Sequence, residues 1–219
     1  MRKRLVIFDL DGTLLDTLGD LATSVNYALR VHGYPEHPLD AYRFFVGNGA
    51  RELIARALPP EHRDDATIDR LREDFRAYYA DGHDTILTRP YPGIAELVER
   101  CRRAGVEMAV ASNKFQSATD KLSRYYFGSE TFRIILGQRE GVPVKPDPAI
   151  VRQILSETGI LPEDTLYVGD SGVDMETARR AGVESVGVTW GFRPREELQA
   201  CGAQHLVDHA EQIWAIIAG

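Results

Sequence analysis

The sequence contains little cysteine, no long apolar run and no excess of positive charge. Its 219 residues include two cysteines, Cys101 and Cys201, which are too few for a disulfide framework and lack metal-ligand spacing. No stretch approaches the roughly 20 apolar residues of a membrane-spanning helix. The net charge of −7 argues against a nucleic-acid partner. The apolar run after the basic residues 2–4 is too short for a signal peptide, so we expect a cytoplasmic protein.

Short apolar runs alternate with helical patterns over most of the chain. Helices between the runs end at glycines such as Gly105 and Gly159, and Asp147 with Pro148 marks the start of the second of these helices. This alternation predicts an α/β fold with a Rossmann-like parallel sheet. The runs that we interpret as buried strands are Leu5–Phe8, Val106–Ala111, Arg133–Leu136, Thr165–Val168 and Glu184–Val188.

The region from 16 to 84 has a different pattern, with helical periodicity and no convincing strand. A glycine-rich joint at Val46–Ala50 precedes a predicted helix from Arg51 to Leu58, and a turn at Arg89–Gly93 returns the chain to the α/β pattern. We therefore predict a core domain formed by 1–15 and 85–219, with an all-helical insert at 16–84. The two longest helical stripes are Leu18, Leu21, Val25, Leu29 and Ile68, Leu71, Phe75, Tyr78.

Polar residues follow the predicted strands at the points where those strands end. Asp9–Thr13 follows the first strand, Ser112–Lys114 the second and Gly169–Asp174 the fourth, while Lys145–Pro148 opens a helix. In an open α/β sheet, chemistry takes place beyond the carboxyl ends of the strands. We expect these four segments to meet at one edge of the sheet and to form a single site.

The residue types in these segments indicate a phosphoryl site. Asp9, Asp170 and Asp174 would form an oxygen-rich pocket that needs a cation, and Mg²⁺ prefers few carboxylates together with water and phosphate oxygens. Lys145 adds a second positive charge and Ser112 offers a hydroxyl group. Turn amides around Gly12 provide further donors for an anion. Phosphoryl transfer needs little beyond positioning and charge stabilisation of this kind.

Asp9 is the natural nucleophile of such a site, because it can form an aspartyl-phosphate. Asp11, two residues further on, points to the same face of an extended strand and could act as the general acid and base. It would protonate the leaving oxygen and then activate water for the second step.

The chain resembles the haloacid dehalogenase-like hydrolases in four motifs that occur in order, DLDGT, ASNK, VKPDP and GDSGVD. The resemblance implies that Thr13 and Ser112 bind the phosphoryl group and that Lys145 neutralises Asp9. It also implies that Asp170 binds Mg²⁺ with Asp9 and the Asp11 carbonyl, supported by Asp174. The insert would be the family's helical cap, and the strand order 5-4-1-2-3 would place the Asp9 strand between the Asp170 and Ser112 strands.

Within this family the chain is similar to the phosphoglycolate phosphatase-like branch. The cap segment Phe45–Ala50 is similar to a signature of that branch, and the Ser112-Asn113-Lys114 triplet fits it too, with Asn113 among the substrate-binding residues. Phe115 departs from the branch, where proline is expected.

Three other positions have more than one interpretation. Lys114 could contact the substrate or be a solvated lysine. Asn48 and Arg51 lie at the predicted start of a cap helix, where free amides favour anions, so they could contact the substrate or belong to an ordinary turn. The segment Trp190–Arg193 follows the last predicted strand and could border the pocket.

These patterns predict a Mg²⁺-dependent phosphatase that acts on a small, phosphoglycolate-like metabolite as a monomer or homodimer. One alternative is a phosphotransferase similar to β-phosphoglucomutase, which would return the phosphoryl group to a sugar. Pyrophosphatases and sugar phosphatases share much of the same pattern. A non-catalytic phosphate-binding module is a further alternative, although a pure binder has no need of Asp11.

Overall fold

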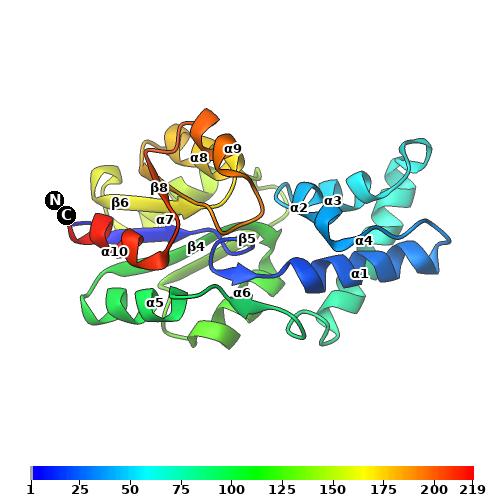
Figure 1. Cartoon of the computed structure of the whole chain (residues 1–219), viewed down its shortest axis with the longest axis horizontal. Helices are drawn as coiled ribbons and strands as arrows, with labels where there is room; N and C mark the ends of the chain where they lie inside the picture. Colours follow the sequence, from blue (N-terminus) through cyan, green and yellow to red (C-terminus); the bar gives the residue numbers. More distant parts are fainter. Residues whose placement is uncertain (1) are drawn as a thin grey trace.

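A six-stranded parallel sheet lies at the centre of the core in the computed structural model, which describes residues 2–219 (Figure 1). The strand order is β5-β4-β1-β6-β7-β8. The five predicted strands are present in the predicted order, and a sixth, short strand adds to one edge. The strands are β1 (Leu5–Phe8), β4 (Glu107–Phe115), β5 (Ile134–Gln138), β6 (Thr165–Gly169), β7 (Glu184–Val188) and β8 (His205–Val207).

The register of the central strands sets the position of the polar segments. Phe8 at the end of β1 pairs with Val110 of β4 and with Val168 of β6. Asp9, Ser112 and Asp170 come one or two positions later and therefore lie at the same end of the sheet. The predicted strand end at Ala111 is wrong, because β4 continues to Phe115 and holds Ser112–Lys114 where its register with β5 shifts. All four residues of β1 are buried, as expected for a central parallel strand covered on both faces.

Helices cover both faces of this sheet. On one face, α5 (Ile94–Arg103) and α10 (Ala210–Ala218) bury Leu97, Cys101 and Ile213 in an apolar cluster with β1 and β4. On the other face, α7 (Ala149–Thr158) and α8 (Gly172–Ala181) pack around β1 and β6. The remaining core helices are α6 (Gln116–Phe127), which packs against β4 and β5, and α9 (Arg195–Ala200).

Four helices gather at the end of the sheet where the central strands terminate (Figure 1). We call these four helices and their connections the cap: α1 (Leu18–Val31), α2 (Leu39–Phe45), α3 (Ala50–Ala57) and α4 (Asp65–Ala80). A 3₁₀ turn at Pro60–His62 precedes α4. The helical pattern of 16–84 is thus present as helices. Of the two adjacent tyrosines in α4, however, Tyr79 is the fully buried one. Tyr78, which the helical stripe placed in the core, stacks on Tyr27 nearer the surface.

Two short strands form the junction between the cap and the core. β2 (Leu15–Asp16) and β3 (Arg89–Pro90) pair antiparallel, so the predicted turn at Arg89–Gly93 begins as a strand. Nearby, the buried Asp20 carboxylate accepts hydrogen bonds from the Leu87 and Thr88 amides. In 2–219, no helix combines the length and the apolarity that a membrane crossing requires.

Candidate active site

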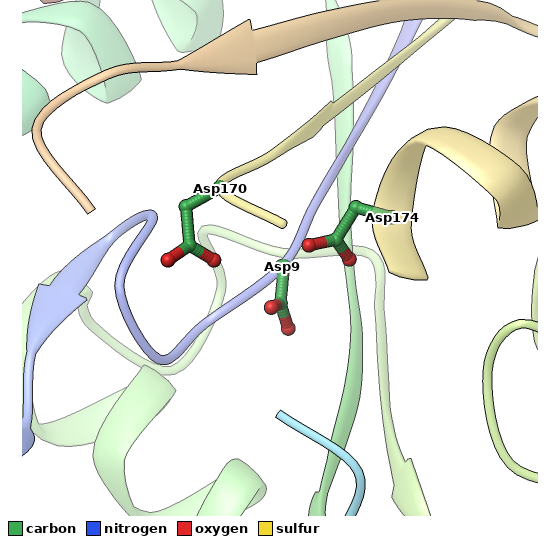
Figure 2. Close-up of side chains that lie close together, drawn as sticks. All are labelled: Asp9, Asp170 and Asp174. Carbon is green, nitrogen blue, oxygen red and sulfur yellow. The ribbon is translucent and has the colours of Figure 1, made fainter. Parts of the chain in front are cut away.

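Three buried carboxylates meet beyond the ends of β1 and β6. Asp9 directly follows β1, Asp170 follows β6, and Asp174 lies in the first turn of α8. One carboxylate oxygen from each lies within 4.8 Å of the others, and Figure 2 shows the side chains converging. The three carboxylates that the sequence predicts for a metal site therefore lie together. The predicted contribution of Asp11 is its backbone carbonyl, which remains a prediction.

The Lys145 ammonium group lies beside two of these carboxylates. Its Nζ atom is 3.0 Å from Asp9 Oδ1 and 2.7 Å from Asp174 Oδ1, and it also donates to the Tyr167 hydroxyl at 3.0 Å. Burial favours the neutral amine, but the Asp174 and Asp9 charges outweigh it and hold the pKa of Lys145 well above its ordinary value. Lys145 therefore stays charged and neutralises part of the carboxylate cluster.

The cluster still contains more negative charge than one lysine can balance. Burial raises the pKa of Asp9 from 3.8 to about 7; Lys145 opposes this rise, while Asp174 and Asp11 add to it. Burial, followed by Asp174 and Asp9, also raises the pKa of Asp170 well above its ordinary value. Burial and mutual repulsion both disfavour the ionised form of these carboxyl groups. A hard divalent cation bound between them would offset both effects, so the cluster suits such a cation.

Close backbone contacts hold Asp170 in its position. Its Oδ2 accepts a 2.7 Å hydrogen bond from the Phe192 amide. A Cβ atom at Gly12 would lie 2.3 Å from that same oxygen, and one at Gly191 would lie 2.2 Å from the Asp170 Cβ. Only glycine fits at either position while Asp170 keeps this orientation. The donor set and this close packing fit an oxygen-preferring cation such as Mg²⁺.

Asp174 is fully engaged within the protein. Its Oδ1 contacts Lys145, and its Oδ2 accepts hydrogen bonds from the Ser171 hydroxyl at 2.6 Å and the Ser171 amide at 3.1 Å, closing a capping box at the start of α8. This arrangement suits a residue that supports the charged groups around it.

Asp11 is oriented by two side chains. Thr17 Oγ1 donates to Asp11 Oδ1 at 2.7 Å, and Lys114 Nζ lies 3.1 Å and 3.3 Å from its two oxygens. Lys114 also lies over the ring of Tyr79 from the cap, 4.6 Å from the ring centroid. Lys114 is therefore buried, which excludes the interpretation as a solvated lysine.

A cavity of about 50 Å³ separates the carboxylates from the cap. Its floor includes Asp9, Asp11, Asp170 and Ser112. Cap residues and two phenylalanines of the core provide apolar walls, which include Leu21, Val46, Leu53, Phe75, Phe115 and Phe192. Because a buried water needs roughly 10–15 Å³ of such volume, the cavity has room for a few waters or one small group.

The other predicted substrate-binding residues lie in different places. Thr13 is fully buried in the turn after β1 and is not among the residues that line the cavity, and its Oγ1 has no hydrogen-bond partner among the described residues. Asn113 reaches the cavity wall, but its amide nitrogen donates to Gly47 O at 3.0 Å and Lys145 O at 3.1 Å, and its oxygen accepts from Lys145 N. Asn113 thus ties the cap joint to the Lys145 loop.

Asn48 and Arg51 are not brought into the cavity. The Asn48 side chain accepts a 2.8 Å hydrogen bond from Arg56, and Arg51 forms ion pairs with Asp65 and Asp69 of α4. Both side chains therefore stabilise the cap internally, and their predicted contact with substrate has no support in this arrangement.

The sequence reasoning did not identify the roles of Phe192 and Arg193. Both line the cavity, and the backbone amide of Phe192 binds Asp170. The sequence predicted only that these residues, which follow β7, could border the pocket. A backbone amide, however, carries no sequence signature that would reveal its partner.

Comparisons with known proteins agree with this geometry. Residues 6–188 match the family model of haloacid dehalogenase-like hydrolases. A phosphoglycolate phosphatase of Pseudomonas putida is 38% identical over 209 residues, covering 94% of this chain and 76% of the relative. A phosphoglycolate phosphatase of Vibrio parahaemolyticus is 32% identical, covering 98% of this chain and 96% of the relative. A crystal structure of a proposed phosphoglycolate phosphatase from Lactobacillus delbrueckii subsp. bulgaricus is 33% identical and superposes with a TM-score of 0.93 over 100% of both chains.

The chain therefore belongs to the haloacid dehalogenase-like hydrolases. Within that family it is a phosphatase of the phosphoglycolate phosphatase-like branch, as the cap segment Phe45–Ala50 and the Ser112–Lys114 triplet predicted.

Proposed function

We propose that the protein is a Mg²⁺-dependent phosphomonoesterase that uses Asp9 as its nucleophile and acts on a small phosphometabolite, with phosphoglycolate as the first candidate. The observation that carries the proposal is the contact of Lys145 with Asp9 and Asp174 beside Asp170. Asp9 and Asp170 also line the small cavity beneath the cap. Phosphoryl transfer by this route needs a nucleophilic carboxylate and fixed positive charge, which Asp9 and Lys145 would supply, and Asp170 and Asp174 add two further carboxylates.

The first step is attack of an Asp9 oxygen on phosphorus, with cleavage of the bond between phosphorus and the leaving oxygen. Asp11 donates a proton to that oxygen, so the product leaves as a neutral alcohol group. In the second step, Asp11 accepts a proton from water, which attacks the aspartyl-phosphate and releases inorganic phosphate and free Asp9. Thr17 and Lys114 hold Asp11 beside the cavity for both steps.

The phosphoryl group needs partners that the described residues leave available. Thr13 Oγ1 is buried without a hydrogen-bond partner among them, and the Ser112 side chain lines the cavity. We assign both hydroxyls to the phosphoryl oxygens. Asp9 and Asp170, with the Asp11 backbone carbonyl and the support of Asp174, would hold Mg²⁺, which supplies positive charge to the transferring phosphoryl group when bound.

The size of the cavity supports a compact substrate. About 50 Å³ beneath the cap leaves little space beyond the phosphoryl group. Relatives that match almost the full chain are phosphoglycolate phosphatases, and their substrate has only two carbon atoms outside the phosphate. We therefore place phosphoglycolate first among the substrates to be tested.

The test is phosphate release from phosphoglycolate, p-nitrophenyl phosphate, pyrophosphate, glucose 6-phosphate and β-glucose 1-phosphate, with Mg²⁺ or with EDTA. We expect turnover that needs Mg²⁺ and is lost in Asp9→Asn, while a matched variant at an exposed aspartate, Asp81→Asn, keeps it. The Asp9 variant should lose at least about 10³-fold in kcat, because no other side chain can form the intermediate. Phosphoryl transfer from β-glucose 1-phosphate to a second sugar phosphate, without phosphate release, would favour the mutase instead.

A further inference from the structure

Residues 190–193, between β7 and α9, contact both the cap and the carboxylate site. We call this segment the bridge loop; its sequence is Trp190-Gly191-Phe192-Arg193. It belongs to the core, yet Phe192 is buried within the apolar cluster of the cap. The loop is therefore placed to transmit a change at either side to the other.

Arginine contacts join the bridge loop to the cap. The Arg193 guanidinium donates to the carbonyl oxygen of Val46 at 2.9 Å and to that of Arg43, both at the end of α2. In return, Arg43 Nη1 donates to the Gly191 carbonyl at 3.2 Å. The Arg193 side chain is only 12% exposed, and its hydrogen bond to Val46 is partly shielded from water.

Backbone contacts join the same loop to the catalytic centre. Phe192 directly precedes Arg193 in the sequence, and its amide donates to Asp170 Oδ2 at 2.7 Å. Gly191 lies so close to Asp170 that it has no room for a Cβ atom. Trp190 Nε1 donates to the carbonyl oxygen of Thr13 at 3.1 Å, which connects the loop to the turn after β1.

We propose that Arg193 is a positioning residue that couples the seating of the cap to the orientation of Asp170. When the cap is seated, the carbonyls of Arg43 and Val46 fix Arg193, and Arg193 fixes the Phe192 amide against Asp170. Mg²⁺ binding and cap seating then favour one another, because a coupling between two sites acts in both directions. The inference rests on the proposed role of Asp170 in Mg²⁺ binding.

The geometry explains why arginine serves here. A planar guanidinium can donate to two carbonyl oxygens at once and still present Nε to a third group, whereas an ammonium group has no fixed fork. Arg193 Nε lies 3.6 Å from Glu197 Oε1, which also accepts from the Gly172 amide at the start of α8, two residues after Asp170. Glu197 therefore orients the guanidinium from the core side.

The experiment compares wild type with Arg193→Met, Arg193→Lys and the cap-side variant Arg43→Met. Arg195→Met is the matched control, because Arg195 is two residues away and pairs only with Asp208 at the surface among the described contacts. Calorimetric titration with Mg²⁺, without substrate, gives the affinity. Hydrogen exchange of the amides from 43 to 50, with and without Mg²⁺, reports cap seating.

We expect Arg193→Met and Arg43→Met to weaken Mg²⁺ binding by about fivefold or more, with Arg193→Lys in between and Arg195→Met unchanged. Mg²⁺ should protect the 43–50 amides in wild type and not in Arg193→Met. Equal Mg²⁺ affinity in wild type and in both methionine variants would overturn the coupling while leaving the proposed function intact. Absence of Mg²⁺ binding in the wild type would overturn both.

Discussion

At the scale of single residues, the site is governed by the conflict between burial and charge at Asp9 and Asp170. Burial raises the pKa of Asp9 to about 7 despite the Lys145 ammonium group 3.0 Å away, and it also raises the pKa of Asp170 well above its ordinary value. Without a cation, the folded protein therefore holds protons on these carboxyls at a pH where an unfolded chain has released them. Protons and the proposed Mg²⁺ would therefore compete for the same oxygens.

This competition predicts how stability depends on pH and on the metal. A carboxyl whose pKa is raised on folding contributes stability below its unfolded pKa, and that stability is lost as the pH rises through its folded pKa. Without metal, the contribution of Asp9 to the free energy of unfolding should therefore disappear as the pH rises from 3.8 to about 7. Mg²⁺ should therefore raise the Tm more at about pH 8 than at about pH 5. Thermal denaturation with Mg²⁺ and with EDTA at both pH values measures this.

Asp170→Asn provides the control for the pH prediction. The amide keeps the volume of the side chain and removes one titrating charge, so the Tm increment from Mg²⁺ should become small at both pH values. An increment in wild type that is equal at both pH values, or larger at the lower one, would contradict competition between protons and metal at these carboxyls.

Residue identities at the site were largely predictable from the sequence, whereas their partners were not. Asp9, Asp170 and Asp174 follow strands or open a helix, so parallel topology alone brings them together. Lys114 was ambiguous because its burial depends on Tyr79 of the cap, which is remote in sequence. Asn48 and Arg51 were predicted as ligands for an anion because the local pattern indicates a helix start. That pattern does not reveal their partners in the cap, which are Arg56 for Asn48 and Asp65 and Asp69 for Arg51.

At the scale of elements, the turn after β1 is the most constrained part of the site. Gly12 has a φ of +84°, and a Cβ there would lie 2.3 Å from Asp170 Oδ2. The turn thus combines a left-handed conformation with a close approach to a carboxylate from β6. A glycine in this place has a conformational role and a spatial role, and substitutions can separate the two.

Gly12→Ala and Gly33→Ala form a matched pair for that purpose. Gly33 has a φ of +73°, but nothing lies within 4 Å of its Cβ position. Both substitutions should destabilise the protein by about 1–3 kcal/mol through backbone strain. Only Gly12→Ala should also displace Asp170 and weaken Mg²⁺ binding, by about 10–100-fold. Denaturant unfolding and calorimetric Mg²⁺ titration measure the two effects; equal Mg²⁺ affinity in both variants would refute the spatial role.

Elements were predictable where their pattern was long or wholly apolar. The five core strands and the helices α5 and α7 follow directly from such runs. β8 was missed because His205-Leu206-Val207 is short and begins with a polar residue, and its pairing with β7 depends on tertiary contact. β2 and β3 have two residues each, and β3 contains a proline, so local propensity argues against them until they pair across the cap junction.

At the scale of the whole molecule, the site exists only where the cap meets the core. The carboxylates come from the core, while Leu21, Val46, Leu53 and Phe75 of the cap form an apolar wall opposite them. At the segment that returns the chain from the cap to the core, Asp20 accepts hydrogen bonds from the Leu87 and Thr88 amides, and Asp84 forms an ion pair with Lys121. We therefore expect the cap to set the size of the substrate and the core to set the chemistry.

This division predicts that shortening one cap side chain changes the substrate range and leaves the chemistry in place. Leu53 of α3 lines the cavity and is 4% exposed, so Leu53→Ala enlarges the space next to the leaving group. The ratio of kcat/KM for p-nitrophenyl phosphate to that for phosphoglycolate should rise about tenfold or more, since a few methylene groups discriminate at this level. Steady-state kinetics with both substrates measures the ratio.

Leu58→Ala separates this effect from a general loss of cap stability. Leu58 directly follows α3, is 2% exposed and belongs to the same apolar cluster, but it is not among the residues that line the cavity. Both substitutions should lower the free energy of unfolding by about 2–5 kcal/mol, because each leaves a cavity in a packed cluster. If Leu58→Ala shifts the substrate ratio as much as Leu53→Ala, loosening of the cap determines specificity and the shape of the wall does not. If only Leu53→Ala shifts it, the cap selects substrates by direct contact with the leaving group.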